Sequence, residues 1–213
     1  MLPWILALIA ASSLVSAPLH ASTQAVSAQA GPTVLVLGDS ISAAYGIQRE
    51  AGWVALLDQR LREHSAGAKV VNASISGETS GGGRARLGDA MALHDPSIVI
   101  IELGGNDGLR GYPTKRLEEN LAAMVEMVQA ENRTAILVGM QIPPNYGIRY
   151  TRAFQQVFHD VAERYQTAFV PFLLDEVALA KGMMQSDGIH PTAEAQSLML
   201  DAVWPVLEPH LTP

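Results

Sequence analysis

Four short polar segments of the sequence carry side chains that could perform nucleophilic catalysis. A serine hydroxyl becomes a good nucleophile when a neutral imidazole lies close enough to remove its proton. A carboxylate must in turn hold the imidazole in the right tautomer and stabilise its charged form. Ser40, His190 and Asp187 can supply these three groups. The four segments are Gly38-Asp39-Ser40, Ser76-Gly77-Glu78, Gly104-Gly105-Asn106-Asp107 and Asp187-Gly188-Ile189-His190.

The same segments contain donors for the oxyanion that forms when a serine attacks a carbonyl. Gly77 offers an unobstructed backbone N–H, Asn106 a side-chain amide and Ser40 its own backbone N–H. Each segment alone has an ordinary explanation, because serines often cap helices and Gly-Gly-Asn-Asp is a common turn. Together they predict acyl transfer with Ser40, Asp187 and His190 as catalytic residues. Ser40, Gly77 and Asn106 would form the oxyanion hole.

The apolar pattern predicts that each of the first three segments follows a strand. Helical patterns lie between the strands, including an apolar stripe from Leu117 to Val128 that we expect Thr114 to cap. Alternating strands and helices predict an α/β fold with a parallel sheet and helices on both faces. Ligands of such sheets bind beyond the carboxyl ends of the strands. Short apolar runs typical of buried parallel strands cover residues 33–37, 69–73, 97–103, 135–140 and 168–171.

The composition limits the partners of the chain. Of its 213 residues, 48% are apolar and 16% are charged, and the formal net charge is −7. An acidic chain without a basic run is not expected to bind nucleic acid. The absence of cysteine excludes disulfides and thiolate metal sites. We expect a monomer that acts on a small-molecule acyl ester or thioester and needs no cofactor or metal.

The N-terminal segment resembles a secretory leader. Residues 2–17 are apolar and of signal-peptide length, and small-residue cleavage patterns follow between about residues 17 and 30. We expect residues 1–30 to be a signal peptide and residues 31–213 to be one hydrolase domain. The protein would then be periplasmic or secreted, with no stable membrane span once the leader is removed. The leader lacks the usual lysine or arginine, so an uncleaved anchor is the alternative.

The four polar segments match, in order, the four sequence blocks of the SGNH (GDSL-type) hydrolases. Residues 71–77, 102–111 and 144–147 resemble the bacterial exported branch of acyl-CoA thioesterase I, lysophospholipase and arylesterase proteins. The resemblance implies a flavodoxin-like three-layer sandwich with five parallel strands. It also implies hydrolysis of aryl esters, acyl-CoA thioesters and lysophospholipids through an acyl-enzyme on Ser40. Ile41 replaces the usual leucine and Glu78 the usual aspartate, and neither change affects the chemistry.

Candidate substrate-binding residues are Leu109, Tyr112, Ile142 and Pro143. Residues 109–113 would form a lid, with Gly108 and Gly111 as hinges and Tyr112 covering an acyl chain. The alternative is an ordinary loop between a strand and a helix.

Two other functions remain open. The first is a metal-dependent phosphoesterase, although two-metal sites usually contain several histidines and His190 is the one well-placed candidate. The second is a non-catalytic lipid-binding module, which would have no use for a complete triad. The residues that the first function would use as ligands are Asp39, Asn106, Asp107, Asp187 and His190.

Overall fold

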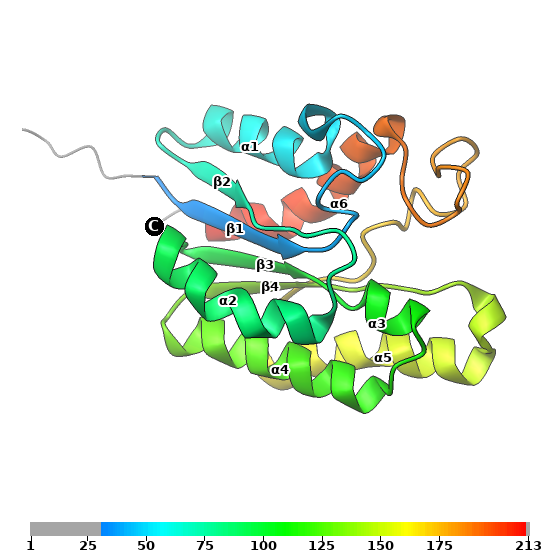
Figure 1. The fold of residues 1–213 in the computed structure, drawn as a ribbon. Coiled ribbons are helices and arrows are strands. Elements are labelled where there is room, and N and C mark those ends of the chain that lie inside the picture. The colour runs from blue at the N-terminus through cyan, green and yellow to red at the C-terminus, as the bar shows by residue number, and fades with distance from the viewer. Residues whose placement is uncertain (1–30, 212–213) are drawn as a thin grey trace, which may run out of the picture.

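The computed structural model describes residues 31–211, which form a single parallel sheet covered by helices on both faces (Figure 1). The strand order is β2-β1-β3-β4-β5, which is the order of the flavodoxin-like fold. The expected α/β sandwich with five parallel strands is therefore confirmed. The strands are β1 (Thr33–Gly38), β2 (Lys69–Asn72), β3 (Ile98–Glu102), β4 (Thr134–Val138) and β5 (Ala168–Val170).

Two groups of helices cover the sheet. One face carries α1 (Trp53–His64) and α6 (Gln196–Leu207), which also pack against each other. The opposite face carries α2 (Ser80–His94), α4 (Thr114–Ala130) and α5 (Ile148–Tyr165) (Figure 1). The short helix α3 (Gly105–Leu109) follows β3 directly. Single 3-10 turns are η1 (Arg49–Ala51), η2 (Pro144–Tyr146), η3 (Ala193–Ala195) and η4 (Glu208–His210).

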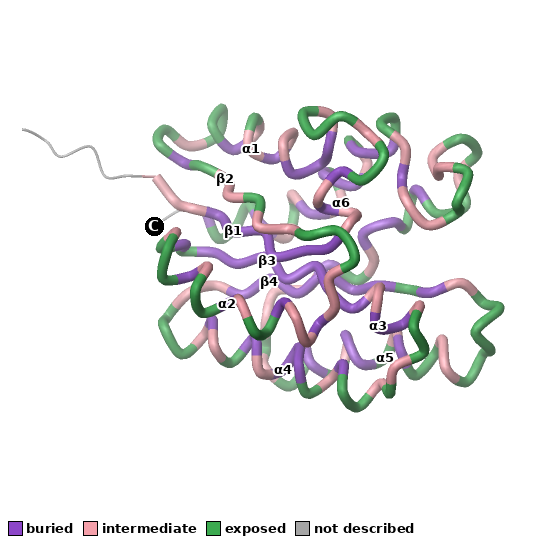
Figure 2. Tube along the Cα trace, in the orientation of Figure 1, coloured by how far each residue is buried: buried purple, intermediate pink, exposed green. Residues whose placement is uncertain are grey.

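The three central strands β1, β3 and β4 consist mostly of apolar residues, as is typical where both faces of a sheet are covered, whereas the edge strand β2 is partly exposed. Figure 2 shows the central strands as buried along their length. Successive residues of β1 alternate between two cores. Val34 and Val36 belong to the core beneath α1 and α6. Leu35 and Leu37 belong to the core beneath α2, α4 and α5.

One helix start differs from the expected cap, and a second threonine before a helix makes no cap bond either. Thr114 is the first residue of α4, and Pro113 occupies the N-cap with no side-chain hydrogen bond. Thr192 precedes η3 without capping it, because its hydroxyl donates to the carbonyl of Gly182 at 3.1 Å. Thr192 therefore stabilises the loop before the helix instead of the helix itself.

No helix within residues 31–211 combines the length and apolarity that crossing a membrane would need.

Candidate active site

Ser40 lies in a tight turn directly after β1. The backbone N–H of Ala43 donates to the carbonyl of Asp39 at 2.9 Å, and that of Tyr45 donates to the carbonyl of Ser40 at 3.0 Å. The Asp39 carboxylate also accepts the backbone N–H of Ile41 at 3.0 Å. These bonds fix the turn at the carboxyl edge of the sheet, which is where ligands of this fold bind.

The three side chains expected to form a catalytic triad lie in direct contact. The Nε2 atom of His190 lies 2.9 Å from Ser40 Oγ, and its Nδ1 atom lies 2.7 Å from Asp187 Oδ2. The other oxygen of Asp187 accepts the backbone N–H groups of Ile189 at 2.9 Å and His190 at 3.0 Å. The carboxylate and the imidazole are therefore held as one unit within a four-residue segment.

The electrostatics of Asp187 suit this arrangement. The hydrogen bond from the His190 side chain lowers the pKa of Asp187 to about 2, with help from the backbone N–H groups of His190 and Ile189. Asp187 is therefore ionised at neutral pH. An ionised carboxylate beside Nδ1 favours the tautomer with its proton on that atom. The lone pair of Nε2 then faces the Ser40 hydroxyl.

The expected oxyanion donors Ser40, Gly77 and Asn106 lie in the segments that follow β1, β2 and β3 at the carboxyl edge of the sheet. Among the described residues, the backbone N–H groups of Ser40 and Gly77 donate to no protein acceptor. Gly77 has φ = +81°, and a Cβ there would meet no atom within 4 Å. Its conformation, rather than a lack of space, therefore explains the glycine. Asn106 on α3 donates both hydrogens of its amide, to Asp39 Oδ2 at 3.1 Å and to the carbonyl of Glu78 at 2.9 Å.

A buried acidic pair lies behind Ser40, and its role was missed in the sequence. Glu102, the last residue of β3, accepts the Ser42 hydroxyl at 2.6 Å and the backbone N–H of Asp39 at 3.2 Å. Burial raises the pKa of Asp39 to about 6. Burial, together with the charge of Asp39, raises the pKa of Glu102 well above its usual range. A glutamate at the end of an apolar strand was the signal that could have identified this pair.

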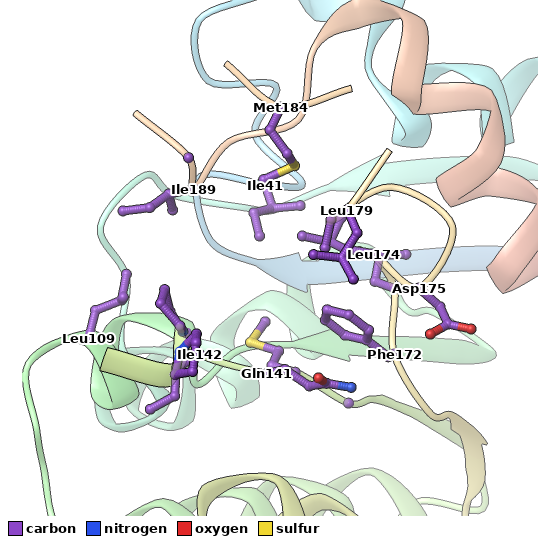
Figure 3. Close-up of a pocket in the computed structure, with 18 of the residues that line it drawn as sticks. Ile41, Leu109, Gln141, Ile142, Phe172, Leu174, Asp175, Leu179, Met184 and Ile189 are labelled. Carbon is purple, nitrogen blue, oxygen red and sulfur yellow. The ribbon is translucent and has the colours of Figure 1, made fainter. Parts of the chain in front are cut away.

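An apolar cavity of about 400 Å³ opens beside these residues (Figure 3). The expected substrate-binding residues Leu109, Ile142 and Pro143 line it. Figure 3 shows that segments far apart in the sequence surround the cavity, which explains why most of its lining was not identified from the sequence. Further apolar side chains at the cavity are Ile41, Met140, Phe172, Leu174, Leu179, Met184 and Ile189.

Tyr112, the fourth expected substrate-binding residue, lines a separate groove. The Arg116 guanidinium lies 5.2 Å from the centroid of the Tyr112 ring, and the Tyr112 carbonyl accepts the Tyr150 hydroxyl at 2.7 Å. The loop that contains Tyr112 is tied down by the bond from its N–H to the carbonyl of Asp107 at 3.0 Å. Gly108, an expected hinge, lies within α3 instead.

The residues considered as metal ligands do not form one cluster. Within residues 31–211, no group of three or more histidine, aspartate or glutamate side chains has a metal-binding arrangement. Asp107 accepts the backbone N–H of Ser80 at 2.8 Å and its hydroxyl at 2.6 Å. This carboxylate therefore anchors the start of α2.

Comparison with known proteins identifies close relatives. Residues 36–198 match the GDSL-like lipase/acylhydrolase family. Esterase TesA of Pseudomonas aeruginosa is 52% identical over 189 residues, which cover 89% of this chain and 92% of the relative. Thioesterase 1/protease 1/lysophospholipase L1 of Escherichia coli K12 is 41% identical over 182 residues, covering 85% of this chain and 86% of the relative.

A solved esterase structure is also similar to this chain. The psychrotrophic esterase EstA from Pseudoalteromonas sp., in a form inhibited by monoethylphosphonate, superposes with a TM-score of 0.80. Its sequence identity is 42%, and the match covers 84% of this chain and 98% of the esterase. The fold, the site and these relatives define an SGNH-type serine hydrolase. The chain belongs to the GDSL-like lipase/acylhydrolase family.

Proposed function

We propose that this enzyme cleaves carboxylic esters and thioesters through an acyl-enzyme on Ser40, with His190 as the base and Asp187 as its partner. The observation that carries the proposal is the continuous contact from Asp187 through His190 to Ser40 Oγ beside an apolar cavity. A positioned base next to a serine is the arrangement that activates its hydroxyl.

The reaction begins when His190 Nε2 takes the proton of Ser40 and Oγ attacks the carbonyl carbon. The N–H groups of Ser40 and Gly77 and the amide of Asn106 stabilise the oxyanion that forms. The intermediate collapses as its bond to the leaving oxygen or sulfur breaks, and His190 returns the proton to the leaving group. Water then attacks the acyl-enzyme with His190 again as the base, which releases the carboxylic acid and restores Ser40.

Aryl esters, acyl-CoA thioesters and lysophospholipids are the substrate classes that this site would accept. Related proteins are named esterase, arylesterase and thioesterase 1/lysophospholipase L1. The apolar lining of the cavity supports a substrate with an acyl chain, because burying such a chain against Leu109, Ile142 and Pro143 is favourable.

The enzyme is exported and acts as a monomer in the periplasm or outside the cell. The apolar leader at residues 2–17 supports export, and residues 31–213 form the hydrolase domain that remains after cleavage. The signal peptide at residues 1–30 lies outside the described residues. Mass spectrometry of the mature protein and its elution volume on size exclusion test the cleavage and the monomer.

The central experiment measures hydrolysis of p-nitrophenyl esters and acyl-CoA thioesters by wild type and by Ser40→Ala. We expect Ser40→Ala to fold normally and to lose turnover, because a partly exposed hydroxyl contributes little to stability. Ser197→Ala is the matched control, because Ser197 is exposed on α6. A Ser40→Ala variant that retained about a tenth of the wild-type kcat would refute the proposal.

The same assay separates the alternative functions. Activity that survives a chelator and disappears with a serine-directed phosphonate supports the proposal, with the phosphonate bound to Ser40 by mass spectrometry. Chelator-sensitive hydrolysis of p-nitrophenyl phosphate, without turnover of carboxylic esters, would indicate a metal-dependent phosphoesterase. Lipid binding without turnover of any ester would indicate a non-catalytic module.

A further inference from the structure

The side-chain amide of Gln185 connects two loops at the active site. Its Nε2 atom donates to the carbonyl of Tyr45 at 2.8 Å and to the carbonyl of Pro191 at 2.9 Å. Its backbone N–H donates to the carbonyl of His190 at 2.8 Å. Gln185 therefore bonds both to the turn after Ser40 and to the segment that carries His190.

Tyr45 completes a path from Ser40 to His190. Its backbone N–H donates to the carbonyl of Ser40 at 3.0 Å, and its carbonyl accepts the amide of Gln185. The Tyr45 ring also lies against the His190 ring, with 4.4 Å between the centroids. The backbones of Ser40 and His190 are thus joined through hydrogen bonds made by two intervening residues, Tyr45 and Gln185.

The segment with Asp187 and His190 needs such a connection. Residues 186–188 are exposed, and regular pairing near them is limited to one isolated bridge between Met184 and Pro191. The bonds between Asp187 and His190 are internal to the segment, so they keep the pair together without fixing its distance from Ser40. Contacts outside the segment must set that distance.

The fit around the amide is close. A Cβ added at Gly46, where φ is +76°, would lie 2.3 Å from Gln185 Oε1. The residue after Tyr45 therefore has to be small for the amide to reach the Tyr45 carbonyl.

We infer that Gln185 is a positioning residue whose amide holds His190 Nε2 within hydrogen-bond distance of Ser40 Oγ. This inference rests on the proposed function, because it assumes that His190 takes the proton of Ser40. Proton transfer depends steeply on this distance, and a displacement of about 1 Å at such a site can lower the rate roughly 100-fold. The pairing of His190 with Asp187 does not depend on Gln185.

The test uses Gln185→Met, which keeps a long side chain and removes both amide hydrogens. We expect kcat for a p-nitrophenyl ester to fall roughly 10- to 100-fold with KM little changed. The midpoint of the pH–rate profile should stay at the wild-type value, because Asp187 remains against His190. Gln129→Met is the matched control, since Gln129 also donates to a backbone carbonyl, that of Tyr165 at 3.1 Å, between α4 and α5.

If Gln185→Met does not fold, a second variant provides the test. Gln185→Glu preserves the shape and places a carboxylate against two carbonyl oxygens, so it should lose at least as much kcat as the methionine variant. Thermal unfolding midpoints separate loss of positioning from loss of folding. A kcat within about twofold of wild type in a folded variant, or a shifted pH midpoint, overturns the inference.

Failure of the proposed function gives a different result. In that case a serine-directed phosphonate does not label Ser40 even in the wild-type enzyme. If the function holds and the inference is correct, the phosphonate labels Ser40 in Gln185→Met, but more slowly than in wild type. Labelling at the wild-type rate would overturn the inference while leaving the function intact.

Discussion

At the scale of single residues, the proposed role of Asn106 as an oxyanion donor competes with the bonds that its amide makes in the free enzyme. Its amide hydrogens are shared between Asp39 and the carbonyl of Glu78 in the free enzyme. These bonds orient the amide next to Ser40 before substrate binds. A negatively charged oxyanion is a stronger acceptor than a neutral ester carbonyl, so we expect the amide to contribute mainly in the transition state.

The variant Asn106→Ala tests this role. We expect kcat to fall roughly 10²–10³-fold with little change in KM, because the lost donor acts mainly in the transition state. Steady-state kinetics with a short-chain p-nitrophenyl ester measures both constants. A rise in KM at unchanged kcat would mean that Asn106 binds the ground-state substrate.

The pH dependence of the reaction also belongs to single residues. His190 must be neutral to accept the Ser40 proton, so kcat/KM should rise between about pH 5 and about pH 8. Asp187, with its pKa lowered to about 2, stays ionised throughout this range. Asp187→Asn should lower both the rate and the midpoint, because it removes the charge that stabilises the imidazolium.

Rates measured from about pH 5 to about pH 8 provide the test. Asp39 titrates in the same range, since burial raises its pKa to about 6. The profile of Asp39→Asn therefore serves as the control for its contribution. A flat wild-type profile would exclude a histidine base, and an unmoved midpoint in Asp187→Asn would contradict its pairing with His190.

At the scale of elements, the ends of β1 and β3 hold Asp39 and Glu102 in a buried site. Each carboxyl has a folded-state pKa above its unfolded value, so the folded state binds these protons more tightly. The contribution of Asp39 to stability is therefore largest below about pH 4 and declines towards about pH 6. The contribution of Glu102 to stability continues to decline at higher pH.

The variant Glu102→Gln should remove the loss of stability that ionisation of Glu102 causes as the pH rises. Its amide oxygen can still accept the bonds from Ser42 and the Asp39 backbone, but it carries no titrating proton. We expect the free energy of unfolding to exceed that of wild type at alkaline pH and to approach it at acid pH. Urea unfolding across pH measures the difference, with exposed Glu63→Gln as the control. A constant difference at all pH values would contradict this assignment.

At the scale of the whole molecule, the cavity is lined by the segments that follow β1, β3, β4 and β5. Ile142→Trp should fill much of it and reduce turnover of long-chain esters more than that of acetyl esters. Tyr112 lies outside the cavity, so Tyr112→Ala should affect both chain lengths equally. A panel of p-nitrophenyl esters from acetyl to palmitoyl measures these ratios.

The same panel decides the lid hypothesis for residues 109–113. A lid requires that Tyr112→Ala reduce long-chain turnover more than acetyl turnover. An equal effect of Ile142→Trp on all chain lengths would show that acyl chains do not enter the cavity.

The sequence by itself was sufficient to predict the strands of the sheet and the four polar segments that carry the candidate catalytic residues. Strands buried on both faces are continuously apolar, so their positions are visible in the linear pattern, as in residues 33–37. Parallel strands end at one edge, so residues that follow different strands are expected to meet there. The hydrogen bond from Asn106, after β3, to Asp39, after β1, is an example. The helix α2 was less visible, because it begins at Ser80-Gly81-Gly82-Gly83 and glycine disfavours helices.

Only the tertiary structure decided which other side chains surround the site. Gln185 and Glu102 are ordinary polar residues in the sequence, and their roles depend on groups that lie 140 and 60 residues away in the chain. Phe172 and Tyr112 are both aromatic residues after strands, yet Phe172 lines the cavity and Tyr112 does not. The physical reason is that loop packing is set by contacts between distant segments, which no local pattern of residue types records.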